Sequence, residues 1–112
     1  MFLTFNIKEN SPTTEEAVAN FLIALEQAKA AGAKVVKIIH GYGSSGKGGA
    51  ILLELKKLLP IFVRQKKIKD YISGAEWNIA NPKVFNLITK CPPCALDEDL
   101  RKSNIGITII VL

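Results

Sequence analysis

Residues 35–49 constrain the fold more than any other part of the chain. Val35–Ile39 is β-branched and nearly all apolar, which is typical of a strand covered on both faces. A glycine-rich loop, residues 40–49, follows it and leads into the apolar periodicity of a helix. A strand, such a loop and a helix in this order aim backbone N–H groups and the positive end of a helix dipole at one point. The segment therefore predicts an α/β protein with a site for an anionic group.

The flanking segments extend this pattern to β-α-β-α. Residues 2–7 alternate between apolar and polar and predict a strand. Residues 13–16 have the spacing of a capping box, and Gly32 is placed to end the helix that follows. A second helix carries its apolar stripe over residues 51–59, and we expect it to stop at Pro60. Such alternation favours parallel strands joined by helices.

The second half of the chain is less regular. Residues 61–71 fit either a strand followed by a short basic helix or a helix throughout. Asn81 and Pro82 predict the start of a further helix, and Trp77 and Phe85 lie in apolar patterns that indicate core positions. Residues 105–112 predict a last, buried strand. We expect a single domain, residues 1–112, folded as a two-layer α/β sandwich with a β-α-β-α start and a mixed, mostly parallel sheet.

Length and composition fit one globular domain. The chain has 112 residues, of which 48% are hydrophobic and 22% charged, and both fractions are ordinary for a soluble protein. It contains no apolar run of the about 20 residues that span a bilayer. Its first residues lack the basic and apolar segments of a secretory signal. We therefore expect a cytoplasmic protein with no membrane partner.

Positive charge is concentrated around the glycine-rich loop. The chain carries a formal charge of +5, but residues 34–69 hold nine Lys and Arg side chains and one acid, Glu54. A local excess of this size predicts a polyanionic partner, DNA or RNA, bound through neutralised phosphates. The alternative interpretation is a lysine-rich surface that is simply solvated.

Two nucleotide-binding motifs fit the loop only in part. The P-loop motif matches from Gly41 to Lys47, but Gly48 stands where the Mg²⁺-binding hydroxyl belongs. The dinucleotide motif G-x-G-x-x-G also matches, but residues 61–64, about 20 positions further on, offer no acid for a ribose. Each motif therefore lacks the partner that its chemistry needs.

A resemblance to a family covers more of the chain. The string Val36-Lys37-Ile38-Ile39-His40-Gly41-Tyr42-Gly43 resembles the H-G-x-G motif of the small MutS-related (Smr) domain. The helix that begins near residue 13 and the strand at residues 104–112 are similar to that family's first helix and closing strand. The likeness covers residues 2–60 and 104–112, and the middle segment is longer than in a typical member.

This resemblance implies a two-layer α/β sandwich that binds DNA or RNA. Many members of the family are endonucleases that use a divalent metal such as Mg²⁺ or Mn²⁺. Their second motif, L-D-x-H-G, closes the first strand, but here Asn6 replaces its acid and Lys8 replaces its histidine. Glu9 alone could assist a metal there, and one carboxylate is a poor metal site. We therefore expect binding rather than cleavage, with no bound metal.

The candidate residues follow from these arguments. His40, the only histidine, is the candidate general base of an endonuclease, the alternative function; it is equally well explained as a structural histidine bonded to a nearby backbone carbonyl. A protein-interaction module on the same fold is a further alternative. The residues expected to contact nucleic acid are Lys8, His40, Gly41, Tyr42, Gly43, Lys47, Arg64, Lys66 and Lys67.

Cys91-Pro92-Pro93-Cys94 is the one motif that suggests redox or metal chemistry. A reactive C-x-x-C places its nucleophile at the N-terminus of a helix, whereas this motif follows the predicted helix. As a zinc site it offers two ligands, with His40 as a third and no evident fourth. We therefore expect a structural turn with two ordinary thiols.

Overall fold

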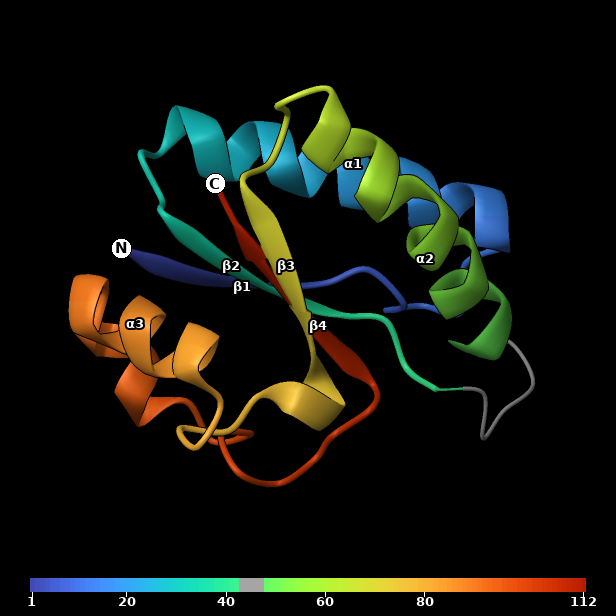
Figure 1. Ribbon diagram of the computed structural model, residues 1–112. Coiled ribbons are helices and arrows are strands. Elements are labelled where there is room, and N and C mark those ends of the chain that lie inside the picture. The colour runs from blue at the N-terminus through green and yellow to red at the C-terminus, as the bar shows by residue number, and fades with distance from the viewer. Residues whose placement is uncertain (43–47) are drawn as a thin grey trace.

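The protein is built around a four-stranded sheet, described here by a computed structural model of residues 1–42 and 48–112 (Figure 1). The strand order is β1 (Phe2–Asn6), β2 (Val35–Ile39), β4 (Ile107–Val111) and β3 (Asp70–Ser73). β1 and β2 are parallel, whereas β4 is antiparallel to both of its neighbours. The α/β class, the β-α-β-α start and the mixed sheet are confirmed. Three strands run in the same direction, but the central position of β4 leaves only one parallel pairing.

Helices cover both faces of this sheet (Figure 1). α1 (Thr14–Ala30) and α2 (Gly48–Arg64) pack on one face, which also presents Val36, Ile38 and Ile110. α3 (Pro82–Lys90) and the 3-10 turns η1 (Gly74–Glu76) and η2 (Pro92–Leu96) cover the other. The two layers expected from the sequence are therefore joined by a third, which the middle segment of the chain supplies.

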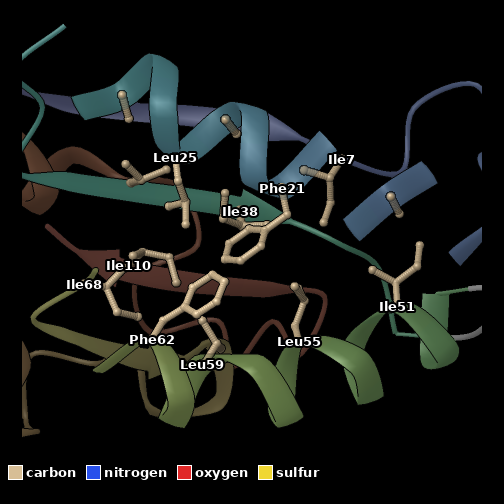
Figure 2. Close-up of a cluster of buried hydrophobic side chains, with 14 of the residues drawn as sticks. Ile7, Phe21, Leu25, Ile38, Ile51, Leu55, Leu59, Phe62, Ile68 and Ile110 are labelled. Atoms are coloured by element: carbon tan, nitrogen blue, oxygen red, sulfur yellow. The ribbon is translucent and has the colours of Figure 1, made fainter. Parts of the chain in front are cut away.

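Local sequence signals explain where α1 begins and ends. The Thr13 hydroxyl accepts a hydrogen bond from Glu16 N at 3.1 Å, and Glu16 Oε1 accepts one from Thr13 N at 2.9 Å. This reciprocal capping box is the one predicted from the sequence. Gly32 adopts φ +77°, a conformation that ends helices and favours glycine. α1 buries Phe21, whose ring stacks on Phe62 of α2 with centroids 6.2 Å apart (Figure 2).

α2 does not stop at Pro60, so that prediction is wrong. The helix continues to Arg64 with Pro60 inside it. Proline removes one backbone hydrogen bond from a helix interior, but Leu59 and Phe62, on either side, are both buried in the core (Figure 2). This packing holds the last turn in place. Residues 65–69 then form an irregular connection to β3, which neither alternative for residues 61–71 described.

α3 begins as predicted. The Asn81 side chain accepts a hydrogen bond from Lys83 N at 3.0 Å, and Pro82 is the first helical residue. Trp77 is fully buried, which confirms its predicted core position. Phe85 is 56% exposed, so the same prediction is wrong for it. It lies one position beyond Val84, outside the buried stripe that Val84 forms with Leu87.

Candidate nucleic-acid interface

The end of β2 is fixed by backbone hydrogen bonds to the segment before β4. His40 N and Gly41 N both donate to the carbonyl oxygen of Gly106, each at 3.0 Å. Gly41 has φ +75°, which turns the chain away from the sheet and favours glycine at this position. Tyr42 follows and is 55% exposed. Gly43 and Lys47, two further candidates, lie outside the described residues.

The His40 side chain is buried, and both of its ring nitrogens are hydrogen-bonded. Nδ1 lies 2.6 Å from the Gly41 carbonyl oxygen, and Nε2 lies 2.8 Å from Thr108 Oγ1. Because a carbonyl can only accept, Nδ1 carries the proton, and neutral Nε2 accepts from the Thr108 hydroxyl. This geometry is that of the structural histidine considered above. A role as general base stays a prediction, and it requires the ring to leave Thr108.

Burial lowers the pKa of His40 below its ordinary value of 6.5. Hydrogen bonding to the backbone of Gly41 and Ile107 opposes this effect only in part, and the positive charge of Lys56 adds to it. His40 is therefore neutral at pH 7. Its neutral form suits the bond from Thr108, because a protonated ring has no acceptor nitrogen.

The lowered pKa of His40 predicts a loss of stability in mild acid. Between the folded and unfolded pKa values the unfolded chain binds more protons, so the free energy of unfolding falls as pH drops below about 6.5. One group contributes at most about 1.4 kcal/mol per pH unit. We expect urea unfolding of wild type and His40→Gln, followed from pH 7.5 to 5, to show this slope only in wild type. Equal slopes in both proteins would contradict the assignment.

Lys8 lies at the same edge of the sheet as His40. Ile7 N donates to the Ile39 carbonyl at 3.0 Å, which holds the carboxyl ends of β1 and β2 side by side. Asn6 Oδ1 accepts from Lys8 N at 3.0 Å and forms the turn after β1, and the Lys8 side chain is exposed. The structure therefore brings Lys8, Gly41 and Tyr42 together, as parallel strands predict.

Arg64, Lys66 and Lys67 lie at the opposite edge of the sheet. Arg64 is the last residue of α2, and Lys66 and Lys67 lie in the connection that leads from it into β3 (Figure 1). Asp70, the first residue of β3, is paired with Val111, the last residue of β4. α2 separates this connection from the His40 loop, and a 17-residue helix is about 25 Å long. One phosphate group cannot contact both edges. The candidate residues thus form two separate groups.

Two further lysines join this second group. Lys69 N donates to the Val111 carbonyl at 2.7 Å, and the Lys34 carbonyl accepts from Leu112 N at 2.9 Å, so both flank the end of β4. We call Lys34, Arg64, Lys66, Lys67 and Lys69 the basic end. All five side chains are exposed, and within the described part of the chain none forms an ion pair. Lys34 and Lys69 belong to the charge excess of residues 34–69, but they are not among the nucleic-acid contacts predicted from the sequence.

Hydrogen bonds to the end of α2 hold the backbone of Lys66 and Lys67 in the basic end. Lys66 adopts φ +60°, and Lys66 N and Lys67 N donate to the carbonyls of Val63 and Phe62 at 3.0 and 2.9 Å. These bonds satisfy the last carbonyls of α2. Ile68 is buried in the core, and the Lys67 ammonium lies 5.0 Å from the centroid of the Phe62 ring. The cations are thus presented from an anchored segment.

Lys37 does not belong to this positive surface. It lies in the middle of β2, is 2% exposed, and forms ion pairs with Asp97 Oδ1, at 2.9 Å, and with Asp99. Burial lowers its pKa, but the hydrogen bonds and charges of the two aspartates outweigh this effect, so the pKa of Lys37 is raised overall. One of the nine cations counted in residues 34–69 is therefore neutralised inside the protein. The sequence signal for this buried ion pair was a single lysine inside an otherwise apolar strand.

The two cysteines are free thiols in a buried turn. Cys91 ends α3 and Cys94 lies in η2, with Cys94 N donating to the Cys91 carbonyl at 3.0 Å. Burial first, and then the neighbouring Cys91, raises the pKa of the Cys94 thiol to about 12. The Cys94 side chain is therefore a protonated thiol at neutral pH. Residues 1–42 and 48–112 contain no group of three or more His, Cys, Asp or Glu side chains that could hold a metal.

Comparisons with known proteins do not assign the chain to a family. No protein-family model, curated protein or solved structure matches it. The resemblance to the Smr domain stays a hypothesis that rests on the motifs quoted above. Among the helices of the described residues, none is long and apolar enough to cross a membrane.

Proposed function

We propose that this protein binds DNA or RNA, mainly through the phosphate contacts of the basic end. The observation that carries the proposal is the grouping of five exposed cations without carboxylate partners in the described structure. They come from the residue before β2, the end of α2 and the connection between α2 and β3. Cations in this state release counterions when they bind phosphates, and this release dominates the affinity of proteins for nucleic acids.

The opposite edge supplies a secondary contact. Along one strand of B-DNA, the about 25 Å of α2 corresponds to about seven phosphates, so one nucleic acid can reach both edges. Lys8 would contact its backbone, and exposed Tyr42 would stack on a base. Cleavage is not part of this proposal, because both ring nitrogens of His40 are occupied.

The salt dependence of binding tests the proposal. We expect the affinity for labelled DNA and RNA, measured by fluorescence anisotropy, to fall steeply between about 50 and about 200 mM salt. Arg64→Gln, Lys66→Gln and Lys67→Gln together should weaken binding about tenfold or more at low salt. Loss of three phosphate contacts should also reduce the slope of log affinity against log salt by about 2 to 3.

The control removes the same charge elsewhere. Lys57, Arg101 and Lys102 are exposed and lie outside the basic end, and Lys57 is already paired with Glu54. Their combined change to Gln should leave the slope close to that of wild type. The proposal fails if wild type does not bind at low salt, or if this control loses as much affinity as the Arg64, Lys66 and Lys67 variant.

A further inference from the structure

A cavity of about 550 Å³ lies on the α3 face of the sheet. It is bounded by α3 and by the edge of the sheet at which β2 and β3 begin and β4 ends. Its volume falls within the range of about 300–1,000 Å³ that is usual for small-molecule sites. Its floor is apolar, because it includes Val35, Ile72 and Leu87, which belong to the core on this face.

Four lysines from four parts of the chain line the same cavity. Lys34 precedes β2, Lys69 precedes β3, and Lys83 and Lys90 lie in the first and last turns of α3. Asp70, the one acidic side chain of the lining, is held by Lys83 Nζ at 2.9 Å. The other three ammonium groups have no carboxylate partner within the described residues. The side chains of the lining therefore carry a formal excess of three positive charges.

We propose that this cavity binds a small organic phosphate monoester, with the phosphate among the lysines and an apolar group on the floor. A phosphate monoester carries about −1.5 to −2 charges at pH 7 and three acceptor oxygens, which matches three unpaired ammonium donors. A bare inorganic anion would leave the apolar floor in contact with water, so the floor favours a ligand with a hydrophobic part. The cavity shares Lys34 and Lys69 with the basic end, but it goes beyond the proposed function because its other wall is α3, which contributes nothing to the basic end.

Phenyl phosphate is a suitable probe, because it combines a phosphate monoester with a compact ring. In a ¹H–¹⁵N NMR titration of the whole chain we expect saturable shifts at the amides of Ile72, Leu87 and Cys91, which line the cavity. Inorganic phosphate and phenol, each tested alone, should bind at least about tenfold more weakly than phenyl phosphate. Lys34→Gln with Lys90→Gln should weaken phenyl phosphate binding about tenfold or more, the effect of losing at least one charged hydrogen bond.

Two controls test the specificity of this site, and the second separates it from the nucleic-acid proposal. Lys57→Gln with Lys102→Gln removes the same charge at exposed positions outside the cavity lining and should not change the titration. The Arg64, Lys66 and Lys67 variant should bind phenyl phosphate as wild type does, even if its nucleic-acid binding is lost. The proposal is overturned if phenyl phosphate causes no saturable shifts at the cavity. It is also overturned if inorganic phosphate binds equally well, or if the Lys34 and Lys90 variant keeps full affinity.

Discussion

Replacing Lys37 with methionine is expected to lower the free energy of unfolding by about 3–5 kcal/mol. The ammonium of Lys37 lies between two carboxylates whose side chains are 6% and 14% exposed, those of Asp97 and Asp99. Methionine fills a similar volume but leaves both carboxylates buried without their counter-charge. Removal of one partner from a buried ion pair is costly because the remaining charge has lost its hydration and gained nothing in return.

The aspartates cannot easily turn away from the vacated position. Asp97 Oδ2 accepts a hydrogen bond from Trp77 Nε1 at 2.9 Å, and Asp99 Oδ1 accepts one from Asn104 Nδ2 at 2.9 Å. The bonds from Lys37 and Asn104 outweigh the effect of burial and hold the pKa of Asp99 below its ordinary value. Because the pKa of Asp99 is lowered in the folded protein, its contribution to stability is fully present above the ordinary carboxyl pKa. The contribution is lost as pH falls from there through the lowered pKa.

Urea unfolding at neutral pH measures this effect. Lys57→Met is the matched control, because Lys57 is 72% exposed and paired only with Glu54 on the surface, and it should change stability by less than about 0.5 kcal/mol. Adding Asp97→Asn and Asp99→Asn to Lys37→Met should restore part of the loss, because it removes the stranded charges. A loss below about 1 kcal/mol for Lys37→Met would show that water solvates the aspartates.

Sequence predicted the features of this fold that depend on neighbouring residues. Thr13 and Glu16 cap α1 within one turn, and Asn81 caps α3 two residues away. Gly32 likewise ends α1 through its own backbone conformation. Each of these signals acts over a few residues, so the printed sequence contains all of the chemistry that it needs. The adjacent ends of β1 and β2 join distant residues, but they follow from the general rule for two parallel strands connected by a helix.

The features that sequence did not predict depend on distant contacts. Lys37 is separated by 60 positions from Asp97, and His40 by 68 positions from Thr108. In the sequence Lys37 is one of the cations of residues 34–69 and His40 is a candidate catalytic residue, whereas in the structure both side chains are buried. The insertion of β4 between β2 and β3 and the continuation of α2 past Pro60 likewise depend on packing across the molecule. The separation of Arg64 from the His40 loop could not be predicted either, because a charge count carries no information about which edge of a sheet a residue occupies.

Gly74 is a second buried position on which distant parts of the chain converge. It is the first residue of η1, and a Cβ atom there would overlap the carbonyl oxygen of Asn104 and come within 2.9 Å of Ile107 Cγ1. Asn104 is itself held in place, since its Oδ1 accepts from Gly106 N at 2.9 Å and its Nδ2 donates to Asp99. The Gly106 carbonyl in turn accepts from His40 N. Displacing Asn104 would therefore disturb both the Lys37 ion pairs and the end of β2.

Gly74→Ala is accordingly expected to lower the free energy of unfolding by more than about 3 kcal/mol, the upper end of the range for overpacking. The overlap is with backbone rather than with the end of a flexible side chain, so no rotamer change relieves it. Gly32→Ala is the control: its Cβ would meet nothing within 4 Å, and only its φ of +77° is unfavourable, at about 1–2 kcal/mol. Thermal and urea unfolding of both variants should rank them in this order. Wild-type stability in Gly74→Ala would contradict the close approach of η1 to Asn104. If Gly74→Ala does not fold in buffer, both variants are compared in a stabilising osmolyte, where we expect the same ranking.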